Sequence, residues 1–267
     1  MTDHTSPWEP LFVGDMLHGA VASRRLLVRA VKALEEFKDA VTVIGAHAVH
    51  VWVEQAWGPI SMEATRDADI ALNPLFVTDN PKLADLMAGA GIAPALADRP
   101  GIYGLADEAE LEWSRRTTVD LIVPEVYAGS GRRAARLPGQ RHAASRAVGL
   151  ELAIWDRAVT KLSTLDPPHE SVDAYVAGPA ALLTAKAHKV HERLAGAVRR
   201  PDRLRAKDSG DVALLMLVSD PTDVGRTMVN ASAAHPEVLT VVAAAASWLR
   251  ELYGPSGGMP RQHATSA

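Results

Sequence analysis

Cysteine is absent from the 267 residues of this chain. A disulfide framework and a zinc site built from thiolates are therefore both excluded, and any metal must be held by carboxylates or histidines. No hydrophobic run reaches the length of about 20 residues that crosses a bilayer. The first ten residues also lack the basic and then apolar pattern of a secretory signal peptide. We therefore expect a soluble, cytoplasmic protein with no membrane partner.

Strong net charge is also absent, since the formal value at pH 7 is only -4. This value disfavours a protein that coats nucleic acid non-specifically, because such binding neutralises many phosphates. The arginines are nevertheless grouped: no acidic residue occurs between Glu125 and Glu151, and a second basic group follows Glu192. We predict a weak RNA-binding surface that includes Arg132, Arg133, Arg136, Arg200 and Arg203. The alternative is a solvated, arginine-rich loop and helix end.

The spacing of apolar residues predicts an α+β fold, with a mixed sheet first and helices alone afterwards. In the first part, we expect helices over 15–38, 46–55 and 81–90, and strands over 40–44, 67–72, 117–123 and 149–154. From Gly178 onward, we expect helices over 179–194, 202–218, 222–234 and 237–253. The predicted domains are therefore 1–174 (α/β) and 175–253 (helical), followed by a disordered tail over 254–267.

Two aspartates alternate with apolar residues in the strand predicted over 67–72. Asp67 and Asp69 project to one face, while Ala68 and Ile70 project into the core. Adjacent carboxylates repel each other, and a divalent cation such as Mg²⁺ would relieve this repulsion. Asp120, in another buried strand, is a candidate third ligand for a site with one or two Mg²⁺ ions. The alternative for an isolated Asp-x-Asp is a strand end or a turn.

Gly45 closes one predicted strand and opens a helix, which is the geometry in which backbone N–H groups face a phosphate. In the helical part, Lys186, Lys189 and Arg193 fall at i, i+3 and i+7, so they form one cationic face suited to a triphosphate. Asp208 and Asp211 share a face of the next helix and could orient Lys186 or an acceptor hydroxyl. A surface lattice of salt bridges is the alternative for both helices.

These motifs resemble a known family. The order Gly45-Ala46, then Thr65-Arg66-Asp67-Ala68-Asp69, then Asp120 resembles the nucleotidyltransferase fold of the polymerase-beta superfamily, and more closely the AbiE-type (AbiEii) nucleotidyltransferase toxins. Lys186, an arginine seven residues later, and Lys207-Asp208-Ser209-Gly210-Asp211 match the later motifs of that family. The sequence departs from the pattern at Ala46, where the family has Gly or Ser, and at Glu63, where it usually has Arg.

The resemblance implies a Mg²⁺-dependent enzyme that moves a nucleoside monophosphate from a nucleoside triphosphate onto RNA, such as the 3′ end of tRNA. It also implies the toxin of a toxin–antitoxin pair, with a cognate antitoxin as a possible partner. The catalytic residues that we predict are Asp67, Asp69, Asp120, Lys186 and Asp208, the first three as metal ligands. The nucleotide-binding residues that we predict are Gly45, Ala46, Thr65, Lys189, Arg193 and Asp211.

Two other functions stay open. The first is a nucleotidyltransferase that modifies a small hydroxylated molecule such as an aminoglycoside. The second is a catalytically silent relative that only binds nucleotide, for which Ala46 and Glu63 give mild support. Neither a Walker loop nor a serine-nucleophile elbow occurs in the sequence.

Overall fold

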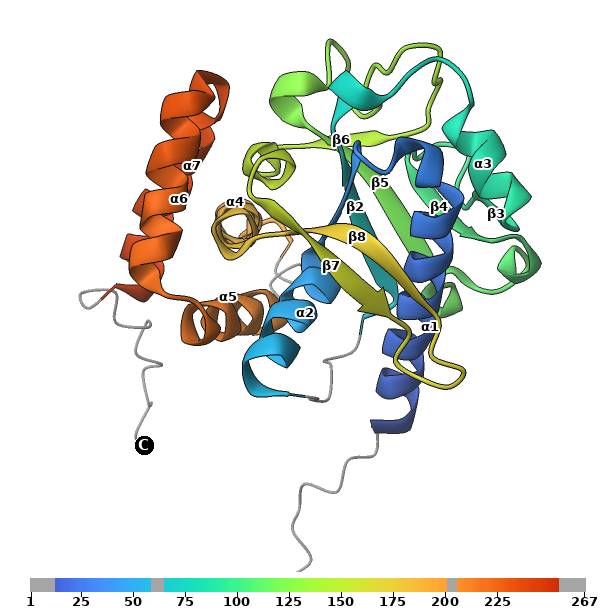
Figure 1. The fold of residues 1–267 in the computed structure, drawn as a ribbon, viewed down its shortest axis with the longest axis horizontal. Helices are drawn as coiled ribbons and strands as arrows, with labels where there is room; N and C mark the ends of the chain where they lie inside the picture. The colour runs from blue at the N-terminus through green and yellow to red at the C-terminus, as the bar shows by residue number, and fades with distance from the viewer. Residues whose placement is uncertain (1–12, 59–64, 201–205, 255–267) are drawn as a thin grey trace, which may run out of the picture.

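The structure, a computed structural model, describes residues 13–58, 65–200 and 206–254. It has the predicted α+β architecture, in which a twisted sheet is followed by a group of helices (Figure 1). The helices are α1 Val13–Ala33, α2 Gly45–Trp57, α3 Leu83–Gly89, α4 Pro179–Gly196, α5 Ala206–Val218, α6 Pro221–Ala234 and α7 Leu239–Tyr253. The strands are β1 Val41–Ile44, β2 Asp67–Leu72, β3 Ile92–Pro94, β4 Ile102–Leu105, β5 Thr118–Pro124, β6 Ser145–Ala147, β7 Arg157–Ser163 and β8 Ser171–Ala177.

The eight strands form one mixed sheet in the order β3-β4-β5-β2-β1-β8-β7, with β6 paired to the second half of β5. The centre of the sheet is β5, β2 and β1, where β2 runs parallel to β5 and antiparallel to β1. These three strands are short and rich in Val, Ile and Ala, as expected for strands that are buried by helices. Two of them, β2 and β5, carry the predicted acidic residues.

Helix α1 lies along the sheet and supplies much of its apolar cover. Leu26, Leu27 and Leu34 are each at most 2% exposed, and they belong to the same core as Ile70 and Leu121 of the central strands. Burying a side chain of this size contributes roughly 1.5–3 kcal/mol relative to leaving it in water. This face of the sheet is therefore closed by packing.

The C-terminal helices begin with α4, whose start is fixed by the preceding part of the chain. Pro179 occupies the first turn, and the Asp156 carboxylate accepts a hydrogen bond of 2.8 Å from the backbone N–H of Ala181. Helix α4 then packs against α2, α5, α6 and α7. Since β8 runs parallel to β1, with Val176 opposite Val43, α4 begins close to the end of β1.

Some sequence predictions were wrong in detail. The strand expected over 149–154 is a 3-10 helix at Glu151–Ile154, because a short buried apolar run does not reveal its own periodicity. The first helix ends at Ala33 rather than near 38.

Several other predictions fall wholly or partly outside the described residues. These are the first residues of the helix expected over 202–218, residues 255–267 of the expected tail, Glu63 and Arg203. Each described helix is too short or too polar to cross a membrane.

Candidate functional site

Gly45 forms the turn between β1 and α2, and its backbone conformation has a positive φ of +71°. A Cβ atom at this position would lie 2.2 Å from Oδ2 of Asp69, so only glycine allows the close approach. The preceding residue, Ile44, has no side-chain acceptor with which to cap the first N–H groups of α2. The first backbone N–H groups of α2 thus lack a side-chain cap and begin beside a carboxylate, which is a suitable place for phosphate bound with a cation.

The acidic residues occupy neighbouring positions in β2 and β5. Asp69 lies opposite Ile44 of β1 on one side and Asp120 of β5 on the other. Along β2 the burial alternates: Asp67 is exposed, Ala68 is 1% exposed, Asp69 is partly exposed and the next residue is fully buried. Asp67, Asp69 and Asp120 therefore project from the same face of the sheet, as the spacing predicts.

The carboxylates influence one another electrostatically. Burial, followed by the charges on Asp69 and Asp67, raises the pKa of Asp120 to about 8. Burial and the charge on Asp67 likewise raise the pKa of Asp69. Burial also acts to raise the pKa of Asp67, but a hydrogen bond from Thr65 and the charges on Lys189 and Lys207 outweigh it and lower that pKa. Each carboxylate thus lies within electrostatic reach of the others.

A cation fits this group. Oδ1 of Asp120 is buried without a hydrogen-bond partner in the described structure, which is costly for a carboxylate oxygen unless another charge satisfies it. Among the described residues, no three acidic or histidine side chains are close enough to form a complete metal cage as they stand. Mg²⁺ does not need one, because it is usually held by one or two carboxylates together with water and substrate phosphates.

Helices α4 and α5 bring cations towards this acidic face. The Lys186 ammonium contacts Asp211, and both side chains are 7% exposed. Arg193 contacts Asp208, and the Lys189 Nζ atom lies 3.5 Å from the same carboxylate. The two acidic residues of α5 thus hold the three cations of α4 in place.

The cationic face of α4 is close enough to influence the strand aspartates. The positive charges on Lys186, Lys189 and Lys207 all act to lower the pKa of Asp69. Lys189 is 44% exposed, so its ammonium remains accessible to solvent. Ala46 follows Gly45 in the first turn of α2, and Thr65 precedes β2 with its hydroxyl directed at Asp67.

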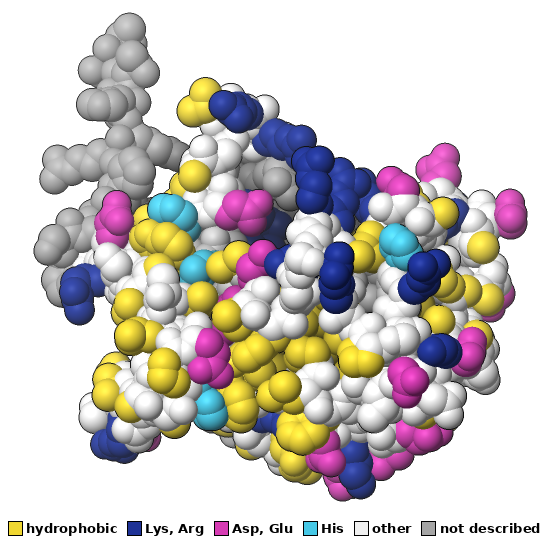
Figure 2. Space-filling model, turned by 90° about the horizontal axis from the view of Figure 1, so that it is seen from above, with side chains coloured by type: hydrophobic (Ala, Val, Ile, Leu, Met, Phe, Trp, Pro, Cys, Tyr) yellow, Lys and Arg dark blue, Asp and Glu magenta, His cyan; other side chains and the backbone are white. Residues whose placement is uncertain are grey.

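The arginines predicted to bind RNA lie on two separate elements. Arg132 and Arg133 are exposed and line a hollow of about 370 Å³ together with His142 in the loop before β6. Arg136 is exposed in the same loop, and Arg200 is exposed beyond the end of α4. Figure 2 shows that Lys and Arg side chains gather in a band along one side of the molecule. Nearby Arg146 instead pairs with Glu125 and has a structural role.

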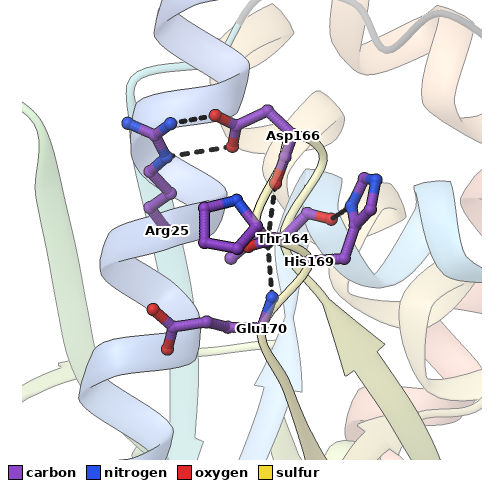
Figure 3. A network of polar contacts seen from close by, with 6 residues as sticks. Arg25, Thr164, Asp166, His169 and Glu170 are labelled. Atoms are coloured by element: carbon purple, nitrogen blue, oxygen red, sulfur yellow. Dashed lines mark hydrogen bonds and ion pairs between the residues drawn. The ribbon is translucent and has the colours of Figure 1, made fainter.

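A groove of about 750 Å³ lies elsewhere, between α1 and the β7–β8 hairpin, and none of the predicted site residues lines it. Arg25 of α1 pairs there with Asp166 in the hairpin loop, beside Thr164 (Figure 3). Lys32 pairs with Glu170 at 2.7 Å. These two exposed ion pairs tie α1 to the hairpin.

Two polar residues near the site, Ser23 and Arg24, were not predicted as functional candidates from the sequence. Ser23 and Arg24 of α1 are 0% and 2% exposed, and they contact His47, which is 0% exposed, at the start of α2. A signal existed for Arg24, because it lies on the apolar stripe of its helix with Leu27 and Val31 at i+3 and i+7.

The chain matches no protein-family model and no curated protein sequence. Among solved structures, it is similar to an antigenic nucleotidyltransferase-like protein from Paracoccidioides brasiliensis, with 12% sequence identity and a TM-score of 0.40. The alignment covers 86% of this chain and 93% of that one. At this identity and TM-score the similarity supports no statement on activity, which must be inferred from the site residues.

Proposed function

We propose that this protein is a Mg²⁺-dependent nucleotidyltransferase that moves a nucleoside monophosphate from a nucleoside triphosphate onto a hydroxyl group. One observation supports this most strongly: Asp69 and Asp120 lie side by side in parallel strands, and Gly45 removes the side chain that would collide with Asp69. The site thus combines carboxylates for a cation with a backbone turn for phosphate.

The reaction is an in-line attack on the α-phosphate. Asp67, Asp69 and Asp120 are the residues that would hold Mg²⁺, which when bound stabilises negative charge on the phosphates and on the departing pyrophosphate. Asp120 accepts the proton of the attacking hydroxyl, a new P–O bond forms, and the bond from the α-phosphorus to the bridging oxygen breaks. Lys186, held by Asp211, and Lys189 stabilise the charge that develops on pyrophosphate.

The remaining predicted residues act in binding. The backbone N–H groups of Gly45 and Ala46 face the phosphates, while Asp208 holds Lys189 and Arg193 towards the triphosphate. Thr65 has two possible roles, contacting phosphate or orienting Asp67. The observed hydrogen bond of 2.5 Å from its hydroxyl to Asp67 Oδ1 favours the second.

We further propose that the acceptor is RNA, because exposed arginines line a hollow in the loop before β6 and lie at the end of α4. A toxin role, a tRNA acceptor and a cognate antitoxin are proposals motivated by the resemblance of the motifs alone.

The test is incubation of purified protein with Mg²⁺, each labelled nucleoside triphosphate and an RNA pool. We expect labelled RNA from the wild type and none from Asp69→Asn. A matched control is Asp173→Asn, which changes an exposed aspartate on β8 and should leave transfer intact. Equal transfer by Asp69→Asn and the wild type would contradict the proposal.

The alternatives predict different results. Label on a small hydroxylated molecule and not on RNA would favour the small-molecule enzyme. Binding of nucleotide by calorimetry, without transfer to any acceptor, would favour the catalytically silent relative.

A further inference from the structure

A chain of buried polar contacts connects α1 and α2 to the acidic strand, and the proposed chemistry uses only its last member, Thr65. Its members are Ser23, Arg24, His47 and Thr65, none more than 5% exposed. Burying polar groups, and a guanidinium above all, is costly unless each one is paired. Such an arrangement therefore calls for a reason beyond the packing of two helices.

The contacts fix which ring nitrogen of His47 carries the proton. The Nε–H group of Arg24 donates to Nδ1 of His47 at 3.0 Å. A guanidinium only donates, so Nδ1 of His47 must accept and its Nε2 must carry the ring proton. Nε2 of His47 lies 2.9 Å from Ser23 Oγ, so it donates to the serine. The single hydroxyl proton of Ser23 has two backbone carbonyls within reach, that of Ala20 at 3.2 Å and that of Thr65 at 2.9 Å, and the shorter contact joins it to Thr65.

Thr65 carries the chain to the proposed metal ligands. Its carbonyl is held by Ser23, and its hydroxyl donates to Oδ1 of Asp67 at 2.5 Å. Helix α1 also approaches this residue closely at Gly19, where a Cβ atom would lie 3.5 Å from the same carbonyl. The position and the rotation of Thr65 are therefore both restrained from α1.

Arg24 is itself fixed from several directions. Its second and third guanidinium nitrogens donate to the carbonyls of His47 and Ser163, each at 3.3 Å, and Nδ1 of His50 lies 3.4 Å away. The contact with Ser163 reaches β7. Arg24 thus joins its own helix, α1, to two other elements, α2 and β7.

We propose that Ser23, Arg24 and His47 are positioning residues, which hold Thr65 and through it the Asp67 carboxylate in the orientation that binds a divalent cation with nucleotide. This inference rests on the proposed function. Hydrogen-bonded neighbours of metal ligands typically affect metal affinity or activity by roughly 10- to 100-fold. If the network were purely structural, substitutions in it would change stability without changing metal affinity or activity.

The test compares Ser23→Ala, His47→Leu and His47→Gln with the wild type. Binding of Mn²⁺, followed by electron paramagnetic resonance, reports on the carboxylates without catalysis, and steady-state kinetics separate kcat from KM. The control is Thr164→Val, which removes a buried hydroxyl in the β7–β8 hairpin, outside the network. Thermal unfolding of all variants shows how much of each effect is loss of stability.

We expect Ser23→Ala and His47→Leu to weaken Mn²⁺ binding by roughly 10-fold and to lower kcat. His47→Gln should restore part of both, because its amide can accept from Arg24 and donate to Ser23. The inference would be overturned if Ser23→Ala and His47→Leu lowered stability but left Mn²⁺ affinity and kcat unchanged, as is expected of the control Thr164→Val. A wild-type protein that neither binds Mn²⁺ nor transfers nucleotide would overturn the proposed function itself, and this inference with it.

Discussion

At the scale of single residues, the candidate site depends on close approaches that few side chains would tolerate. Gly45 lies against Asp69, and Asp69 lies beside Asp120, so the glycine turn and the carboxylates share one small volume. The motif residues could be predicted from the sequence because strand alternation places Asp67 and Asp69 together. The contacts of Ser23 with His47 and Thr65 could not, since they join positions 24 and 42 residues apart.

Replacement of Gly45 by alanine tests whether the site needs the close approach of this residue to Asp69. The new Cβ would meet Asp69, and the positive φ would be strained by roughly 1–3 kcal/mol. We predict at least a 100-fold loss of kcat/KM, since small displacements of a reacting group have effects of about this size. Gly225→Ala is the control, because nothing lies within 4 Å of a Cβ built on this helical glycine. Transfer by Gly45→Ala at the wild-type rate would show that the turn does not contact the nucleotide.

A buried glutamate gives a pH-dependent prediction. Burial raises the pKa of Glu151 above its ordinary value of 4.5, although it accepts a hydrogen bond of 2.7 Å from the Gly149 N–H. Between about pH 4.5 and the raised pKa, the folded state holds a proton on Glu151 that the unfolded state has lost. The free energy of unfolding therefore falls as the pH rises through this range.

Glu151→Gln removes this titration. We predict that the unfolding free energy of the wild type, minus that of the variant, decreases as the pH rises from about 4 to about 8. Urea unfolding at several pH values measures it. A difference that stays constant, or grows, would contradict the raised pKa.

At the scale of secondary-structure elements, the central strands were predictable and the edge of the sheet was not. Strands β1, β2 and β5 are short buried runs bounded by Gly, Asn or Pro, whereas β7 is an edge strand with several exposed residues and no clear alternation. The short apolar run over 149–154 predicts a strand, but its residues Glu151–Ile154 form a 3-10 helix in which all four are buried. The local pattern of apolar residues indicates that a segment is buried, but it does not indicate which neighbouring element covers that segment.

Helix α4 carries the cations of the site, and its start is held by Asp156. We predict that Asp156→Ala lowers stability by about 1 kcal/mol, as for loss of a helix cap. We also predict a roughly 10-fold lower kcat, because Lys186 and Lys189 are displaced with the helix. Asp220→Ala is the matched control: Asp220 caps α6 through Thr222 and Asp223, so the variant should lose similar stability and keep its activity. Urea unfolding and steady-state kinetics measure both, and equal kinetics in the two variants would contradict this role of α4.

At the scale of the whole molecule, the sheet and the helical part are joined by specific contacts. The Tyr127 hydroxyl donates to Glu237 at 2.7 Å, and Trp155 stacks on His235 with ring centroids 3.6 Å apart. Helix α4 also packs directly on α2. The separation into domains at 1–174 and 175–253 remains a prediction, and these contacts suggest that the two parts do not unfold independently.

We therefore predict a single cooperative unfolding transition for the full chain, with coincident curves from tryptophan fluorescence and far-ultraviolet circular dichroism. Tyr127→Phe should lower the midpoint, because its hydroxyl donates one hydrogen bond to Glu237 and accepts another from Trp155, each worth about 1 kcal/mol. Two separate transitions in the wild type would contradict this coupling.

The proposed reaction breaks the bond from the α-phosphorus to the bridging oxygen. The most direct measurement uses one nucleoside triphosphate labelled either at the α- or at the γ-phosphate, with Mg²⁺, RNA and the wild-type protein. Our account predicts that the α-label appears in the RNA and that the γ-label is released as pyrophosphate, with both signals lost in Asp69→Asn. Transfer of the γ-label to the acceptor would contradict this prediction. So would release of both labels by Asp69→Asn to the same extent as by the wild type.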